Sequence, residues 1–382
     1  MNGCGAHEEF FSECFRQAVI SHVGPAVPPF AVAALAAAVL TLGAILIGRR
    51  AGWVKKVRER DIHTRPVPDV GGLALYGAFA LAALLFAPRS EYRTGMLLLG
   101  LAAVVIMFVD DRIQVHAWIK LGVQVALAAV AVEAFAPSTF QITYLSFPGS
   151  GLIHIGLLAL PVTVLWLVGM QNTVNLLDGI DGLAAGVAAI VALTLLVAAS
   201  TRGPDDVVLL SACLAGACAG FLLFNWHPAR IFMGDSGSNF LGLALGLLSV
   251  AGVAKVTAAF ALFIPVLALG IPIVDTAWAI VRRRRQGVSI AHPDTKHIHH
   301  QLLDFGLSQR EACIVFYCGT GILGAVGLTI FHHKRVLAIT IVMLIVVLST
   351  IVAEHLERAE WRLPVPWLGR LLAQSASTNR TR

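Results

Sequence analysis

Residues 95–112 read GMLLLGLAAVVIMFVDDR, an apolar run that ends in two adjacent aspartates and an arginine. The apolar part, Met96–Val109, has the composition of a membrane-spanning helix, which needs about 20 mostly apolar residues. Asp110 and Asp111 follow directly, where such a helix reaches the lipid headgroups. Carboxylates at this border are costly and indicate function by default. The segment therefore predicts a membrane helix that carries a functional acidic pair at one end.

The composition of the whole chain extends this pattern. Of its 382 residues, 57% are hydrophobic and 13% are charged, compared with about 25% charged residues in soluble domains. These values exclude a soluble globular protein and a disordered one. Apolar runs that could form membrane helices lie near residues 30–48, 71–88, 95–109, 117–136, 153–171, 184–200, 207–224, 237–254, 257–281, 312–331 and 336–354.

We therefore predict an all-α integral membrane protein with about 11 transmembrane helices. An external segment, 1–29, precedes the membrane domain, 30–354, and a cytoplasmic tail, 355–382, follows it. Cytoplasmic loops retain Lys and Arg, and an external N-terminus places 21 of the 28 Lys and Arg residues inside. The C-terminus is then cytoplasmic. These clustered charges indicate topology rather than a nucleic-acid-binding face.

The clusters of polar residues that could take part in catalysis or binding all fall on the predicted inner side. A set of carboxylates, amides and imidazoles on one face of a membrane protein predicts an active site that opens to the cytosol. Besides Asp110-Asp111-Arg112, the clusters are residues 65–72 (RPVPDVGG), 172–182 (NTVNLLDGIDG), 227–238 (HPARIFMGDSGS) and 292–300 (HPDTKHIHH).

The acidic pair favours a site for a divalent cation. Two adjacent carboxylates repel each other unless a cation or a basic partner compensates their charge. A hard ion such as Mg²⁺ takes carboxylate oxygens together with substrate phosphates. Either Asp110 or Asp111 could then bind the metal, while its neighbour acts as a base or a nucleophile. A solvated helix end is the simpler alternative for the pair alone.

The next two clusters place polar residues beside glycines. Gly179 and Gly182 favour a loop or a helix start, in which backbone N–H groups approach a ligand closely. Asp235 is expected in a Gly-flanked turn that opens the next helix, where an N-cap at Asp235 or Ser236 would also explain it. Around Gly179 and Gly182, four polar residues are spaced three positions apart: Asn172, Asn175, Asp178 and Asp181.

The last inner cluster is rich in histidine. His297, His299 and His300 stand beside Lys296, and no cysteine lies near them. Imidazoles that hold a nucleotide or a diphosphate fit this setting better than a zinc site. The run Arg282 to Arg285 that precedes them is typical of a cytoplasmic membrane border.

In this order and with these separations, DDR, NxxNxxDGxDGLA, FMGDSGS and HxHH resemble the motifs of the polyprenyl-phosphate N-acetylhexosamine-1-phosphate transferases over about residues 45–320. The resemblance implies Mg²⁺-dependent transfer, with Mn²⁺ as a possible substitute, of a sugar 1-phosphate from a UDP-sugar to a polyprenyl phosphate. The products would be a polyprenyl-diphosphate sugar and UMP. The site would face the cytoplasm at the bacterial inner membrane, and a homodimer is plausible.

The resemblance also implies a role for each matching residue. Asp110 and Asp111 match the acidic pair that activates the lipid phosphate, Asp235 the metal-binding carboxylate, and Asn175 and Asp111 further metal contacts. The residues that match donor or phosphate contacts are Asn172, Asp178 and Asp181 on the nucleoside side, Phe232 under the uracil, His297, His299 and His300 in the histidine motif, and Lys120 and Arg283 at the phosphates.

The histidine motif favours one branch of this family. The phospho-N-acetylmuramoyl-pentapeptide branch typically carries three consecutive histidines followed by Glu. This chain differs from that motif, because it has His297-Ile298-His299-His300-Gln301. We therefore expect UDP-N-acetylglucosamine as donor and undecaprenyl phosphate as acceptor, as in the synthesis of lipopolysaccharide O-antigen, enterobacterial common antigen or teichoic acid. The pentapeptide branch and a modified UDP-sugar remain open. A membrane transporter is the remote alternative, because membrane carboxylates also line transport pathways.

Overall fold

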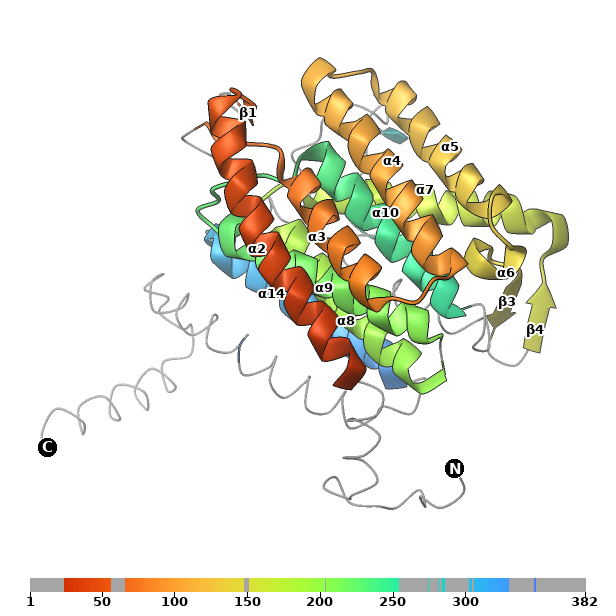
Figure 1. Ribbon diagram of the computed structural model, residues 1–382. Coiled ribbons are helices and arrows are strands. Elements are labelled where there is room, and N and C mark those ends of the chain that lie inside the picture. The colour runs from red at the N-terminus through yellow and green to blue at the C-terminus, as the bar shows by residue number, and fades with distance from the viewer. Residues whose placement is uncertain are drawn as a thin grey trace, which may run out of the picture.

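The computed structural model describes residues 24–55, 66–147, 151–202, 204–253, 302–303 and 306–329, with the single residues 274, 281, 284, 285 and 347 (Figure 1). Its long helices are α2 (Val27–Arg50), α3 (Gly71–Phe86), α4 (Glu91–Ile113), α5 (Ala117–Glu133), α7 (Ala159–Leu177), α8 (Leu183–Arg202), α9 (Asp205–Asn225), α10 (Gly234–Val253) and α14 (Gln309–Thr329).

Short elements connect these helices. The antiparallel pair β1 (Val54–Lys55) and β2 (Val67–Pro68) lies between α2 and α3. A second antiparallel pair, β3 (Tyr144–Phe147) and β4 (Gly151–His154), lies between α5 and α7. The remaining pieces are the 3₁₀ turns η1 (Gly24–Ala26) and η2 (Gly156–Leu158) and the single turn α6 (Pro137–Phe140).

The described chain is that of an all-α membrane protein. Nine of the predicted apolar runs coincide with its long helices, whereas the runs 257–281 and 336–354 lie outside the described residues apart from single positions. Among the described residues, six helices are long and apolar enough to cross a membrane: α2, α4, α7, α8, α9 and α14, with α3 as a shorter apolar helix. The total of 11 spans and the positions of the termini stay predictions.

One predicted boundary is wrong. The run near 153–171 was expected to form a helix and residues 172–182 a loop or a helix start, but β4 ends at His154 and α7 runs from Ala159 to Leu177. Asn172 and Asn175 are therefore helical. They can remain inside the bundle because their amides bond to side chains of α5 and α10. The loop prediction holds only from Asp178 onward, where α7 has its C-cap.

Helix α10 lies at the centre of the bundle (Figure 1). It packs against α3, α4, α7, α8 and α9, and every residue from Ser236 to Ala251 is buried. Glycines permit this close packing, because a Cβ at Gly242 would lie 2.5 Å from the Cα of Gln171 on α7. The first turn of α10 is consequently held in a fixed position by the surrounding helices.

Helices α2 and α9 pack equally closely through Gly216 and Gly220 on α9, which are spaced as in the GxxxG pattern of membrane helix pairs. A Cβ on these glycines would overlap the backbone carbonyl oxygens of Phe30 and Ala34, respectively. Backbone contact of this kind cannot be relieved by a side-chain rotation. The pair therefore has no space for a larger residue.

Replacing Gly220 with Ala should destabilise the protein by about 1–3 kcal/mol, the usual cost of overpacking. The matched control is Gly43→Ala on α2, where a Cβ would meet nothing within 4 Å and where Ala favours the helix. Thermal unfolding in detergent micelles should show a lower Tm for Gly220→Ala alone. Equal Tm values for the two variants would contradict the close packing of α2 and α9.

Candidate active site

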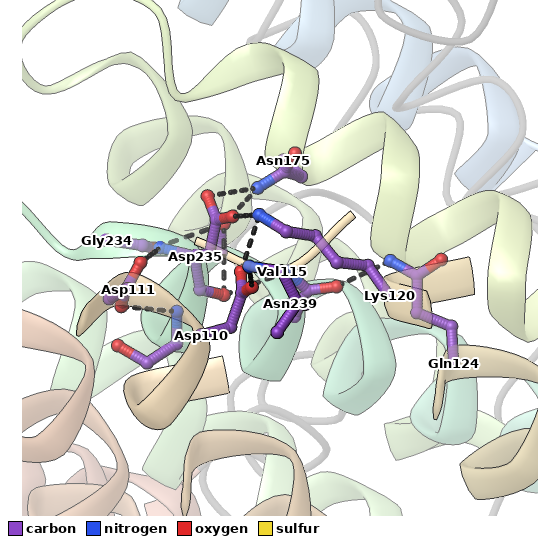
Figure 2. A network of polar contacts seen from close by, with 11 residues as sticks. Asp110, Asp111, Val115, Lys120, Gln124, Asn175, Gly234, Asp235 and Asn239 are labelled. Atoms are coloured by element: carbon purple, nitrogen blue, oxygen red, sulfur yellow. Dashed lines mark hydrogen bonds and ion pairs between the residues drawn. The ribbon is translucent and has the colours of Figure 1, made fainter. Parts of the chain in front are cut away.

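The ends of four helices meet at one polar site (Figure 2). Asp110 and Asp111 lie in the last turn of α4, and Asn175 lies in the last turn of α7. Lys120 comes from the first turns of α5, and Asp235 from the first turn of α10. Three of the predicted inner clusters are therefore brought together by the packing around α10.

Lys120 connects two of the carboxylates. Its Nζ lies 2.5 Å from Asp110 Oδ2 and 2.6 Å from Asp235 Oδ2. The second oxygen of Asp110 accepts a hydrogen bond of 2.9 Å from the backbone N–H of Val115, and Asp110 is only 4% exposed. Both carboxylates thus converge on one position that a cation occupies, here the ammonium group.

Asp235 is also held from the side of α7. Asn175 Nδ2 donates to Asp235 Oδ1 at 3.1 Å and to Ser238 Oγ at 2.8 Å. One oxygen of Asp235 therefore faces an amide and the other faces Lys120. This environment favours the ionised carboxylate.

Asp111 has a different role in the geometry from its neighbour. Its Oδ1 accepts from the backbone N–H of Asp235 at 2.9 Å, and its Oδ2 accepts from that of Ser236 at 3.2 Å. These N–H groups belong to the first turn of α10, where no intrahelical acceptor exists, and a negative charge there is favoured by the helix dipole. The sequence suggested that Asp235 or Ser236 would cap this helix, but a carboxylate from α4 binds its first N–H groups.

The first turn of α3 is bonded to the segment that leads into α10. The backbone N–H groups of Gly71 and Gly72 donate to the carbonyl oxygens of Phe232 and Met233, both at 2.9 Å. A Cβ on Gly71 would lie 2.6 Å from the Phe232 oxygen, and one on Gly72 would overlap the backbone N of Gly237. The two glycines are therefore required for the approach of α3 to the start of α10.

Arg112 fixes the loop before α3 to the end of α4. Its Nη2 lies 2.9 Å from Asp69 Oδ1, and its guanidinium carbon lies 4.9 Å from the ring centre of Phe108 and 5.7 Å from that of Trp53. The arginine of the DDR sequence thus binds the loop that precedes α3.

The turn after α7 contains Asp181, which holds the next inner loop. Asp181 Oδ2 lies 2.8 Å from His227 Nδ1 and accepts from the Ala229 N–H at 3.0 Å. Arg310 from α14 donates to the carbonyl oxygen of His227 at 3.1 and 2.9 Å. Asp181 therefore shapes the loop 227–231 in this structure, and its predicted contact with a nucleoside stays a prediction.

Asp178 and Phe232 lie near a further cation. The pKa of Asp178 is raised to about 7, chiefly by desolvation, although the residue is partly exposed. The positive charge of Lys55 lowers this pKa, whereas the negative charges of Asp235, Asp111 and Asp181 raise it further. Lys55 Nζ also lies 5.8 Å from the ring centre of Phe232. Phe232 is partly exposed, as a residue that stacks on a base has to be.

Asn172 does not point toward these residues. Its Nδ2 donates to Gln124 Oε1 on α5 at 2.7 Å and to the carbonyl oxygen of Val168 at 2.9 Å. Of the other predicted contacts, His297, His299, His300 and Arg283 lie outside the described residues.

The sequence predicted no role for Gln124, Asn239 and Lys55, and it indicated Asp69 only as part of the cluster 65–72. For Gln124 and Asn239 a signal existed, because each follows a predicted site residue, Lys120 or Asp235, by four positions and so lies on the same helix face. Asp69 and Lys55 become relevant only through contacts between segments distant in sequence.

The donor atoms at the centre of the site fit a hard cation. Asp110 and Asp235 converge on one point with carboxylate oxygens, which Mg²⁺ prefers, and Asn175 lies beside Asp235 with its Nδ2 toward that carboxylate. Among the described residues, no group of three or more His, Cys, Asp or Glu side chains could hold a metal by itself. An ion here would depend on substrate phosphates for further ligands, as is usual for Mg²⁺.

Comparison with known proteins places this site in a family. The sequence model of glycosyl transferase family 4 matches residues 93–253, from α4 to the end of α10. A probable undecaprenyl-phosphate N-acetylglucosaminyl 1-phosphate transferase of Bacillus subtilis (strain 168) is 34% identical over 85% of this chain and 90% of its own length. A decaprenyl-phosphate N-acetylglucosaminephosphotransferase of Mycolicibacterium smegmatis is 36% identical over 86% and 90%.

A further similarity covers less of the chain. The phospho-N-acetylmuramoyl-pentapeptide-transferase of Heliobacterium modesticaldum is 39% identical over 53% of this chain and 67% of its own length. The matched region of the family model contains Asp110, Asp111, Lys120, Asn175 and Asp235, the five residues whose side chains meet at the centre of the site. The chain belongs to glycosyl transferase family 4.

Proposed function

We propose that this protein transfers N-acetylglucosamine 1-phosphate from UDP-N-acetylglucosamine to undecaprenyl phosphate, at the cytoplasmic face of a bacterial inner membrane. The products are undecaprenyl-diphosphate N-acetylglucosamine and UMP. The observation that carries this proposal is the convergence of Asp110 and Asp235 on Lys120 at the ends of the apolar helices α4, α5 and α10. A lipid acceptor is consistent with a site at a membrane border. Two phosphorylated substrates are consistent with the ammonium group of Lys120 between two carboxylates, because phosphate oxygens need positive charge beside them.

The reaction joins an oxygen of the acceptor phosphate to the sugar-bearing phosphorus of the donor. The bond from that phosphorus to the bridging oxygen breaks, and UMP leaves with the electron pair. Phosphoryl transfer depends chiefly on positioning and on stabilisation of charge. Lys120 is placed to offset the charge that grows on the phosphate oxygens, and Mg²⁺, held by Asp235 with Asn175 beside it, would supply further charge neutralisation.

Asp110 is the carboxylate best placed to act on the acceptor. Both oxygens of Asp111 are engaged by backbone N–H groups of α10, so Asp111 keeps the first turn of α10, including Asp235, at the site. Asp110 instead faces Lys120, where it can take a proton from the acceptor phosphate. Covalent attack by Asp110 is the alternative, and a trapped phospho-sugar enzyme would reveal it.

The choice of donor rests on the extent of similarity. The two N-acetylglucosamine enzymes match 85% and 86% of this chain, whereas the pentapeptide enzyme matches 53%. The sequence His297-Ile298-His299-His300 points the same way. A panel of radiolabelled UDP-sugars with undecaprenyl and decaprenyl phosphate tests both substrates. Uptake of a radiolabelled UDP-sugar into proteoliposomes without release of UMP would instead support a transporter.

The acids of the site should be essential for turnover. Asp110→Asn, Asp111→Asn and Asp235→Asn should each lower kcat by at least about 10²-fold, the scale of losing a base or an electrostatic stabiliser. The control is Asp205→Asn at the exposed start of α9, which should behave as wild type. Turnover of purified protein measures the effect, and full activity of all three variants would contradict the assignment.

Divalent cations should control both activity and stability. EDTA should abolish turnover, and Mg²⁺ or Mn²⁺ should restore it, because an oxygen donor set serves hard cations. Mg²⁺ should also raise the Tm of the wild type but not that of Asp235→Asn, since ligands stabilise the state they bind. Loss of activity with a zinc chelator that Mg²⁺ cannot reverse would indicate instead a metal site in the histidine cluster.

Phe232 should contribute to donor recognition. Phe232→Ala should raise the KM for UDP-N-acetylglucosamine with less effect on the KM for the lipid, because base stacking contributes ~1–3 kcal/mol. Phe232→Tyr keeps the ring and is the matched control, with a KM near that of the wild type. A change confined to the lipid KM would place Phe232 in the acceptor groove.

A further inference from the structure

A second polar layer, made of side-chain amides, lies one helical turn deeper than the ion pair. Gln124 follows Lys120 by one turn on α5, and Asn239 follows Asp235 by one turn on α10. Gln124 Nε2 donates to Asn239 Oδ1 at 2.7 Å. The helices α5 and α10 are thus joined at two successive turns, first by Lys120 and Asp235 and then by Gln124 and Asn239 (Figure 2).

The hydrogen bonds of this layer have a direction. They begin on α7, where Asn172 Nδ2 donates to Gln124 Oε1 at 2.7 Å. They end on α10, where Asn239 Nδ2 donates to the backbone carbonyl oxygen of Asp235 at 2.9 Å. The amide of Gln124 is consequently bound at both its oxygen and its nitrogen, and the chain of bonds terminates on the main chain of a site residue.

Because the amides of this layer are buried, their polar atoms need hydrogen-bond partners within the protein. Gln124 is 4% exposed and Asn239 is 2% exposed, and a buried amide without a partner is costly. Interhelical hydrogen bonds in membrane proteins nevertheless contribute only modestly to stability. Stability alone therefore does not explain a chain of amides across three helices that ends at Asp235.

We propose that Gln124, Asn239 and Asn172 are positioning residues that keep Lys120 and Asp235 in register during phosphate transfer; this inference rests on the proposed function. When phosphates enter the site, the contact between Lys120 and Asp235 has to loosen, because both groups are needed by the substrates. The amide layer carries no charge, so arriving phosphates do not compete for it. It holds α5 against α10 in that state, and Asn172 acts through Gln124 rather than on the nucleotide.

The test compares two hydrogen bonds that join helices of the bundle. Gln124→Leu removes the amide at nearly constant volume and should lower kcat about tenfold with little change in either KM, because misplacement affects the transition state most. The matched control is Ser249→Ala, which removes the 2.9 Å bond from Trp166 Nε1 on α7 to Ser249 on α10, far from the site. It should lower Tm but leave kcat unchanged.

A double-mutant cycle shows whether the amide acts through the lysine. In a Lys120→Ala background, Gln124→Leu should reduce kcat by no more than about twofold. The reason is that the effects of two substitutions in one hydrogen-bond network are not additive. Asn239→Ala provides the second measurement should Gln124→Leu fail to accumulate in membranes, and the same cycle applies to it.

Two results would overturn the positioning role. One is that Gln124→Leu, or Asn239→Ala in its place, affects kcat no more than Ser249→Ala does. The other is that its effect multiplies with that of Lys120→Ala. Failure of the proposed function gives a distinct result, because Lys120→Ala and Asp235→Asn would then keep wild-type turnover. Loss of turnover in these two variants with a neutral Gln124→Leu would contradict the positioning role alone.

Discussion

The ammonium group of Lys120, held between the carboxylates of Asp110 and Asp235, is the interaction on which the site depends. Charged groups at the border of a membrane are costly unless they are paired. Here, three helices each contribute one member of the cluster, so the charges compensate one another only when α4, α5 and α10 are assembled. The same arrangement defines a point where a cation and phosphate oxygens can meet.

The position of α10 is the second condition for this arrangement. Its residues from Ser236 to Ala251 are buried, and glycines at close contacts let α3 and α7 approach its backbone. Asp111 binds the N–H groups of its first turn. Packing therefore fixes where Asp235 lies, and the two members of the acidic pair have different partners: Asp110 faces Lys120, and Asp111 holds the helix that carries Asp235.

The polar layers also show how a membrane protein can keep many polar side chains inside a bundle. Asn172, Asn175, Gln124 and Asn239 are bonded to one another or to site residues. A neutral layer under a charged layer combines rigid geometry with a site whose ion pairs can exchange partners. Catalysis by positioning and electrostatics needs both properties.

The sequence by itself determined the all-α membrane class, most helix positions and the acids at their ends, because the length of apolar runs and the cost of charges at membrane borders are local properties. It also indicated the family. Only the tertiary structure decided that Asp110 and Asp111 have different partners, that Asn172 bonds to Gln124, and that Asp181 holds His227. The contact between Asp110 and Lys120 joins consecutive helices, and the other contacts join segments about 45 to 125 residues apart. Helix periodicity does not specify which faces of different helices meet.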